Sequence, residues 1–547
     1  MAKERRADTG WVEPPRPIKG LDHLGVQAPC IALYTELLPG ITNVTDRARY
    51  YSFHPWLLWS FDNRYKVDRS LEELRRVLRR AECLFTLVAI RHARNTGDSD
   101  ERRHGIAMVG RQQLLKVADE ATVDLGMFAT MEDVETRYLG NVLGGLGQYY
   151  YGSLRDLRLI DQVQGAEPGY PGYGEKLGPW IAKAMDAGVD GDRFFKVLEQ
   201  EQVTHQDLDD LSEFCPCQLV KSYAECEALR DLFLARTDEL RVDGEARRTA
   251  LALLLDLSER VPGLSAGALQ ATFRSSCYTG YLPSDATGAR VWTVSAQLEH
   301  ARKRWGVYEQ NDLFAVSLQG LFSAVLETIE LTESGYLPSV SSAGAIASAL
   351  LASARPEFKN VSFAEFLART KAELALPESW EDPRHEEQIA NEVVDTKNPS
   401  ERAARSVDLL AALLARGVPT EPYADFALGP DYFDLAEINL RSLVRRIESE
   451  WANVPFEQWV HWLATRWGVG RHLRVALRKL RFQRQDTFRV RPLEDGFRVV
   501  ESPPPGFTVP RLGPAIQILR DLGLIDDNGD GIELTDDGKT QLGGLRG

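Results

Sequence analysis

The sequence predicts a mainly α-helical, multi-domain protein with winged-helix-like modules that carry small β-hairpins. Three observations predict this fold class. The chain has 547 residues, apolar residues recur along most of it at three- and four-residue spacing, and strand-like stretches are few and short. A chain of this length rarely folds around a single hydrophobic core, so we expect two to four domains. The shares of hydrophobic residues (44%) and charged residues (27%) are those of ordinary globular proteins.

Helical periodicity is clearest at residues 70–93, where arginines separate the leucines and other apolar residues. Similar patterns recur at 179–200, 245–260, 292–331, 363–375, 402–416 and 435–452. Breaks in the pattern fall at 94–105, 163–178, 376–402 and 501–510. The third break is long, acidic and poor in apolar residues, which predicts an exposed linker or flexible loop.

These breaks predict three domains. We expect an N-terminal helical domain at 1–200 that ends in a winged-helix-like unit, and a helical body at 201–450 that contains the acidic linker 376–402. A basic winged-helix-like region should follow at 451–547.

Two octapeptides in the chain differ at a single position. "LRDLRLID" stands at 154–161 and "LRDLGLID" at 519–526. The second copy predicts an amphipathic helix stopped by Gly523, a tight turn, a short strand and a new helix capped by Thr535. The first copy has the same order of parts. We interpret the pair as one helix–hairpin–helix unit used twice, the typical ending of a winged helix; the alternative is a chance match between two leucine-rich helix ends.

The most basic part of the chain lies near its C-terminal end. Arg471, Arg474, Arg478 and Arg481 fall at i, i+3, i+7 and i+10, which puts four guanidinium groups on one helix face over roughly 15 Å. Lys479 and Arg484 widen this face. The opposite face, expected to anchor the helix to a core, consists of Leu473, Ala476, Leu477 and Leu480. A hairpin that carries Arg489 and turns at 494–496 should follow.

A basic helix followed by a basic hairpin is how a winged helix meets DNA. Residues 441–491 hold twelve basic and four acidic residues, a net +8 within a chain of −15. The overall negative charge argues against binding nucleic acid over the whole surface but permits a local patch. Two alternatives stay open: a solvated helix face, or arginines paired with the acidic linker elsewhere in the fold.

A second candidate site lies at 37–61, where Arg47 and Arg49 stand at the expected start of an aromatic-rich helix. A helix N-terminus with two arginines can hold a phosphate or a carboxylate. The alternative is that both arginines pair with acidic groups inside the domain.

This segment resembles a bacterial protein family with the N-terminal signature PG-x-[ST]-x-[IV]-T-x-R-[AI]-RYY-x-F-x-x-W. The matching residues are Pro39, Gly40, Thr45, Arg47, Arg49, Tyr50, Tyr51, Phe53 and Trp56. "FCPCQL" (214–219), "HLRVALRKLR" with "DTFRVRP" (472–492) and the closing "ILRDLGLI" are also similar to members of this family. The resemblance covers most of the chain. Because members often lie among restriction and anti-phage genes, it implies a defence-associated role, without catalytic residues.

Four residues offer metal-ligand types at H-x9-C-x-C-x8-C spacing: His205, Cys215, Cys217 and Cys226. The spacing is not that of common zinc modules, and buried cysteines are frequent in cores. We therefore expect neither a metal nor another cofactor. No hydrolase, metalloprotease or kinase signature is present either, so we lean against an enzyme.

Other features bear on location and partners. The N-terminus "MAKERRADTG" is charged, the apolar runs fall short of the roughly 20 residues of a bilayer span, and six cysteines indicate no disulfide framework. We expect a cytoplasmic protein that does not enter membranes. Our leading hypothesis is a non-catalytic, nucleic-acid-associated subunit of a multi-gene bacterial defence system, which binds duplex DNA and other protein subunits. The alternatives are a protein–protein adaptor for an ATPase or nuclease partner and, third, a nuclease with a dispersed site.

Overall fold

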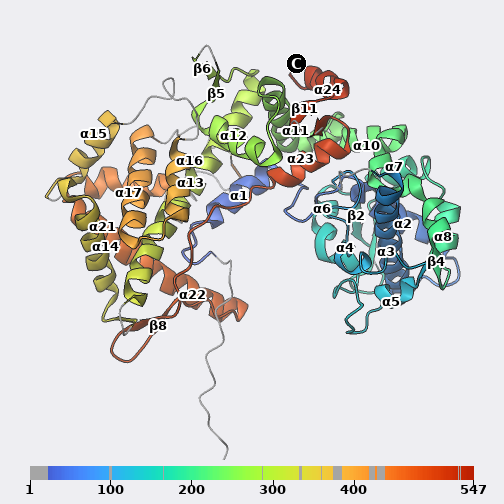
Figure 1. The fold of residues 1–547 in the computed structure, drawn as a ribbon, viewed down its shortest axis with the longest axis horizontal. Helices are drawn as coiled ribbons and strands as arrows, with labels where there is room; N and C mark the ends of the chain where they lie inside the picture. Colours follow the sequence, from blue (N-terminus) through green and yellow to red (C-terminus); the bar gives the residue numbers. More distant parts are fainter. Residues whose placement is uncertain are drawn as a thin grey trace, which may run out of the picture. The chain divides into compact units, whose positions relative to one another are not determined.

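The computed structural model describes residues 22–97, 102–163, 165–285, 288–331, 335–358, 360–373, 385–417, 426–427, 438–527, 529 and 531–546. The protein is mainly helical, as predicted, and its strands form small antiparallel sheets (Figure 1). The chain divides into two compact units, each assembled from three separate segments. Unit 1 comprises residues 1–33, 275–291 and 304–508, and unit 2 comprises 34–274, 292–303 and 509–547. This division differs from the three consecutive domains expected, because the region 451–547 is shared between the units.

Most elements of unit 2 precede residue 280. Its helices are α2 (Tyr50–Arg64), α3 (Leu71–Thr96), α4 (Arg111–Leu114), α5 (Leu125–Ala129), α6 (Tyr151–Asp156), α7 (Leu177–Asp186), α8 (Gly191–Leu198), α9 (His205–Asp209), α10 (Tyr223–Phe233), α11 (Asp238–Arg260), α23 (Leu512–Asp521) and α24 (Asp536–Arg546). Its strands are β1 (Thr122–Val123), β2 (Ile160–Gln162), β3 (Pro171–Tyr173), β4 (Val203–Thr204), β10 (Ile525–Asp527) and β11 (Ile532–Leu534).

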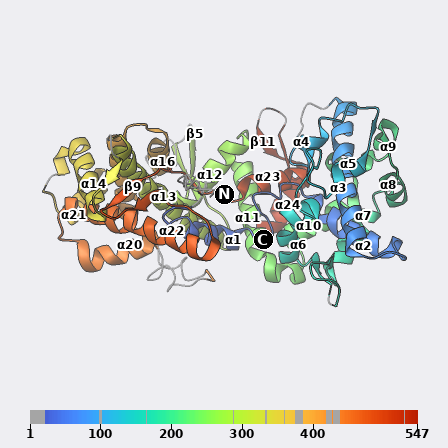
Figure 2. The same ribbon diagram turned by 90° about the horizontal axis from the view of Figure 1, so that it is seen from below.

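Unit 1 is built largely from later residues, and three helices cross the boundaries between units. Its helices are α14 (Val340–Ala354), α15 (Phe363–Glu373), α16 (His385–Asp395), α17 (Pro399–Arg416), α20 (Leu440–Arg446), α21 (Phe456–Trp462) and α22 (Gly470–Gln483), with α20, α21 and α22 orange in Figure 2. Its strands are β5 (Tyr281–Asp285), β6 (Gly288–Val291), β7 (Tyr336–Leu337), β8 (Val490–Pro492) and β9 (Phe497–Val499). The helices that cross a boundary are α1 (Ala28–Leu37), α12 (Ala266–Thr279) and α13 (Ala296–Glu330).

The core of unit 2 forms around α2 and α3. Helix α3 starts where the Ser70 hydroxyl accepts a hydrogen bond from the backbone N–H of Glu73, and it ends at Gly97, whose φ of 63° suits glycine. The two helices are joined by buried polar groups, because Nε2 of His54 lies 2.8 Å from Oε1 of Glu82. Aromatic rings pack beside this pair, with Phe53 stacked on Phe85 at 4.2 Å between ring centroids.

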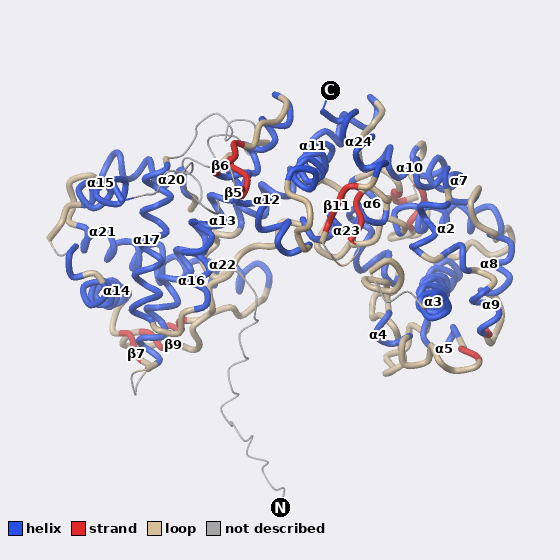
Figure 3. Tube along the Cα trace, turned by 45° about the horizontal axis from the view of Figure 1, so that its top comes forward, coloured by secondary structure: helices blue, strands red, loops and turns tan. Residues whose placement is uncertain are grey.

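The repeated octapeptides occupy equivalent places in two helix–hairpin–helix segments of unit 2. The order is α6–β2–β3–α7 in one segment and α23–β10–β11–α24 in the other (strands are red in Figure 3). The turns after the first helices match, since Leu159 N–H donates to the Leu154 carbonyl just as Leu524 N–H donates to that of Leu519. Gly523 has a φ of 67°, and Arg158 takes the same left-handed conformation at 58°. The predicted order of elements is therefore present in both copies.

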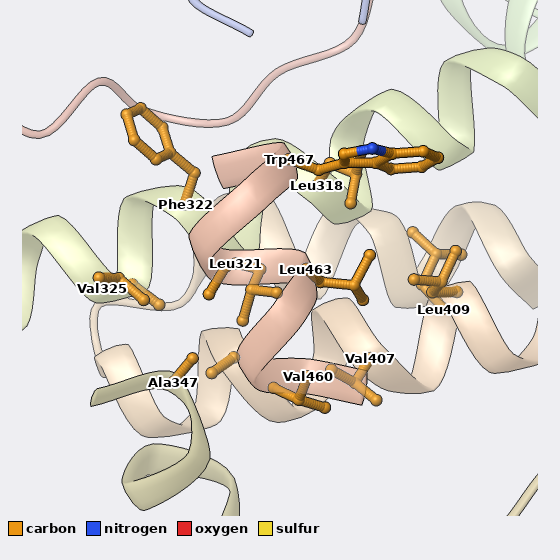
Figure 4. Close-up of a cluster of buried hydrophobic side chains, with 14 of the residues drawn as sticks. Leu318, Leu321, Phe322, Val325, Ala347, Val407, Leu409, Val460, Leu463 and Trp467 are labelled. Atoms are coloured by element: carbon orange, nitrogen blue, oxygen red, sulfur yellow. The ribbon is translucent and has the colours of Figure 1, made fainter. Parts of the chain in front are cut away.

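The core of unit 1 lies between α13, α14, α17 and α21. Leu321 and Val325 of α13 face Ala347, Val407 and Leu463 from the surrounding elements (Figure 4). These residues are nearly or fully inaccessible to solvent, and burial of a leucine-sized side chain contributes about 1.5–3 kcal/mol. Apolar burial therefore stabilises this helical packing.

The hairpin predicted after the basic helix is present. Strands β8 and β9 pair antiparallel, Val490 opposite Val499, and β7 adds a third strand on the far side of β9. The sheet order β7–β9–β8 therefore includes a strand from a distant part of the sequence.

Part of the expected acidic linker is a helix. Residues 385–395 form α16, which buries Glu386, Ala390 and Val393 against the rest of unit 1, so the linker prediction is wrong there. A hydrogen bond from Arg416 Nε to the carboxylate of Glu386 offsets part of the cost of this burial. Residues 376–384 of the predicted linker lie outside the described residues.

Among the described residues, α13 alone is long and apolar enough to cross a membrane by length and composition. In this structure 83% of its apolar window is buried within the protein. The core helix of a globular protein meets the same criteria, so α13 is weak evidence for a membrane span.

Candidate functional sites

Arg47 and Arg49 lie just before α2, as predicted, but both side chains are fully buried. Nε of Arg47 lies 3.0 Å from a carboxylate oxygen of Asp521, and Arg49 binds both carboxylate oxygens of Glu225 at 2.8 and 3.1 Å. The acidic partners belong to the same unit. The expected anion site is therefore not supported, and the structure shows the alternative, two internal ion pairs.

The remaining donors of these guanidinium groups bind backbone carbonyls. Arg47 donates to the carbonyls of residues 102, 103, 104 and 106, and Arg49 donates to those of Glu213 and Cys215. Burial raises the pKa of Asp521, while Arg47 opposes the rise. The two arginines thus fix two loops, one leading to His104 and one leading to Cys215.

These two loops bring a group of potential metal ligands together. His92 is near the end of α3, and His104 is in the loop fixed by Arg47. Cys217 lies in the 3-10 helix Pro216–Lys221 after α9, and Cys215 directly precedes that helix. One ligand atom from each of the four residues lies within 4.8 Å of the other three. Within the described residues this is the only group of three or more such side chains.

The residues proposed from sequence spacing join this group only in part. Cys215 and Cys217 belong to it, but Cys226 lies elsewhere, with its Sγ 3.7 Å from the carbonyl of Leu522. His205 begins α9 and is likewise outside the group. His92 and His104 could not be predicted from the sequence, because no local spacing connects them to the cysteines.

The two cysteines of the group differ in their electrostatics. Burial raises the pKa of the Cys215 thiol well above its ordinary value. A hydrogen bond from Cys215 lowers the pKa of Cys217, and His104 lowers it further. Cys217 is therefore the cysteine that carries thiolate character.

A pocket of about 420 Å³ adjoins this group within unit 2. Its lining includes His92, His104, Cys217, Arg103, Lys221 and Asp526. Asp521 and Asp526, two carboxylates in its wall, pair with Arg47 and Arg103. Among the described residues that line the pocket, both carboxylates therefore have an arginine partner.

The basic helix α22 belongs to unit 1, and the basic residues predicted for this helix and the segment after it fall into two sets. Arg471, Lys479 and Arg489 turn toward the protein: Nε of Arg471 donates to the Leu24 carbonyl at 3.0 Å, Nζ of Lys479 donates to that of Asp22 at 2.7 Å, and Arg489 pairs with Glu501. The other four are exposed, and none forms an ion pair within the described part of the chain: Arg474, Arg478, Arg481 and Arg484.

The anchoring face of α22 differs from the prediction. Ala476 is buried and Leu473 packs partly against the core, but Leu477 and Leu480 are 59% and 44% exposed. The buried side chains are His472, Val475 and Ala476. The predicted anchoring face is therefore confirmed for Leu473 and Ala476 and wrong for Leu477 and Leu480.

His472 is the polar anchor of α22. Its Nε2 accepts a hydrogen bond from the backbone N–H of Arg489 at 2.8 Å, so the proton sits on Nδ1, which donates to the carbonyl of His23 at 3.2 Å. Burial, together with the positive charges of Arg489 and Lys479, lowers the pKa of His472 to about 4. A neutral imidazole thus ties α22 to β8 and to the segment before α1.

Comparison with known protein families, curated proteins and solved structures finds no significant match. The sites are therefore interpreted from their own geometry.

Proposed function

We propose that this protein is a non-catalytic, nucleic-acid-associated subunit that contacts the phosphate backbone of duplex DNA through α22. The observation that carries the proposal is the solvent exposure of Arg474, Arg478 and Arg481, together with Arg484 at the helix end. Guanidinium groups without acidic partners remain available to phosphates, and each such contact releases counterions from the duplex.

The surroundings of α22 support the proposal. Arg466 is exposed before the helix, and Arg474 donates to its carbonyl at 3.4 Å. In the hairpin after the helix, Arg498 of β9 is also exposed. Helix and hairpin together would then act as the recognition helix and wing of a winged-helix-like module.

The N-terminal signature indicates the kind of system in which this DNA contact would be used. Its resemblance to a family found among anti-phage genes favours a role inside a multi-gene bacterial defence system, where the DNA contact would serve partner subunits. The chain itself would act in the cytoplasm.

A second candidate function is favoured by one observation. Leu477, Leu480 and Phe482 are exposed between the arginines of α22, and Phe482 is 74% exposed. Apolar side chains interleaved with arginines are typical of protein interfaces. On this alternative, α22 docks an ATPase or nuclease partner as an adaptor.

The test measures the affinity for labelled duplex DNA by fluorescence anisotropy at several salt concentrations. We expect a log–log slope of roughly −0.9 per phosphate contacted. The double variant Arg474→Ala/Arg478→Ala should flatten that slope by about two units and weaken all duplex sequences alike.

Two control variants sharpen the test. Arg155→Ala/Lys183→Ala removes the same charge from exposed positions of unit 2 and should leave the slope unchanged. Leu477→Ser/Phe482→Ser should also leave it unchanged if α22 binds DNA. The proposal fails if the wild-type protein shows no salt-dependent binding, or if the control charge variant flattens the slope equally.

A further inference from the structure

The group formed by His92, His104, Cys215 and Cys217 has short distances between its ligand atoms. Nδ1 of His92 lies 3.4 Å from Nδ1 of His104 and 3.3 Å from Sγ of Cys217. Nδ1 of His104 also lies 3.3 Å from Sγ of Cys215. Each imidazole therefore directs the same ring nitrogen toward one shared point.

These distances match the edges of a metal-centred tetrahedron. With Zn–S bonds of about 2.3 Å and Zn–N bonds of about 2.0–2.1 Å, the ligand atoms of a tetrahedral site lie roughly 3.3–3.8 Å apart. The three distances above are at the short end of this range, and the remaining pairs are within 4.8 Å. We propose that unit 2 binds one Zn²⁺ ion through the Nδ1 atoms of His92 and His104 and the Sγ atoms of Cys215 and Cys217.

The chemistry of the four side chains favours a metal over hydrogen bonds alone. Two Nδ1 atoms that face each other at 3.4 Å satisfy one another only if one carries a proton, and each also faces a sulfur atom. A bound cation satisfies all four lone pairs at once, with neutral imidazoles and deprotonated thiols. Two nitrogen and two sulfur ligands in this arrangement select zinc among the common divalent ions.

The residues around the group hold the ligands in place. Arg49 donates to the carbonyl of Cys215 at 2.7 Å, and Arg47 lies 3.4 Å from that of His104. The Gln218 side-chain amide donates a hydrogen bond to Sγ of Cys217 at 3.1 Å. Such outer contacts fix ring orientation and ligand position in metal sites.

The site has the form of a structural zinc centre. Four protein ligands complete a tetrahedron and leave no position for substrate. The ion would connect the end of α3, the following loop and the segment after α9. The adjoining pocket, whose wall includes His92 and Cys217, provides a path by which the ion enters.

The primary test measures bound metal in the full-length protein by elemental mass spectrometry. We expect about one zinc per chain, and removal by a strong chelator should lower Tm by roughly 5–10 °C. Adding Co²⁺ to the metal-free protein should produce absorption bands of thiolate-to-cobalt charge transfer and of tetrahedral Co²⁺. A protein that contains no zinc, takes up neither Zn²⁺ nor Co²⁺ stoichiometrically and keeps its Tm with chelator would overturn the proposal.

Variants locate the ion. His92→Gln and Cys217→Ser change the two partly exposed ligands and should each lose the metal. The matched controls His205→Gln and Cys226→Ser change the same residue types outside the group and should retain one zinc per chain. Loss of zinc from the controls but not from the ligand variants would refute this ligand set. If a ligand variant does not fold, the cobalt spectrum of the wild-type protein decides, because it reports thiolate ligation directly.

Discussion

The arginines before α2 and those on α22 use the same side chain in opposite ways. Arg47 and Arg49 are fully buried, and their guanidinium groups are hydrogen-bonded to a carboxylate and to several carbonyls. Arg474 and Arg478 are exposed and form no ion pair within the described ranges. Arginine content alone therefore does not locate a binding surface. The two sets are distinguished by the number of internal acceptors within reach of each guanidinium group.

The largest effect should come from breaking a buried pair. Replacing Arg49 with alanine leaves Glu225 charged and buried, and loss of one partner of such a pair costs about 3–5 kcal/mol of unfolding free energy. Urea unfolding measures the loss. A decrease in unfolding free energy of less than about 1 kcal/mol would contradict the structural role assigned to Arg49, because a buried charge without its partner destabilises a fold by more than that.

The second effect concerns the anchor of α22 and depends on pH. Since burial lowers the pKa of His472 from 6.5 to about 4, the imidazole takes up a proton in the unfolded chain before it does so in the fold. The stability that His472 contributes is therefore complete above pH 6.5 and is lost as pH falls toward 4, by about 3 kcal/mol in total. Urea unfolding of the protein across this range should show the decrease.

A control separates His472 from its neighbours. His23, whose pKa burial also lowers, faces the same site together with Arg489 and Lys479. His472→Gln keeps a donor and an acceptor but does not titrate, so it should flatten only part of the pH dependence. An unchanged pH profile in this variant would show that His472 is not the titrating anchor.

The smallest effects on unfolding free energy are expected when two arginines of the same basic segment are replaced. Arg489 is 2% exposed and pairs with Glu501, so Arg489→Ala should lower the unfolding free energy by about 1–3 kcal/mol. Arg474→Ala should change it by less than about 0.5 kcal/mol. Equal losses from the two variants would mean that the exposed arginines are structural as well, which would remove the basis of the DNA-binding proposal.

The mainly helical character of the chain and the positions of many helices could be predicted from the sequence. The helix expected at 70–93 is α3 at Leu71–Thr96, and that expected at 292–331 is α13 at Ala296–Glu330, because apolar periodicity is a local property. The two helix–hairpin–helix segments were predictable for the same reason. The helix at 385–395 could not be predicted, because it buries a glutamate whose partner, Arg416, lies 30 residues away.

The sites depend on long-range contacts and were harder to predict. The Leu477 and Leu480 face was expected to be buried, but the segment that covers α22 comes from residues near 22–26, more than 440 positions earlier. His92 and His104 meet Cys215 and Cys217 across more than 100 residues. Neither spacing nor composition carries that information.

The pairing of Arg47 with Asp521 has a consequence for the order of folding during synthesis. The two residues are 474 positions apart, so at roughly 5–20 residues per second Arg47 waits about 25–95 seconds for its carboxylate to be made. Throughout that time the growing chain contains the start of unit 2 without the segment 509–547 that completes it. Unit 2 therefore cannot finish folding until after residues 304–508 of unit 1 have been made.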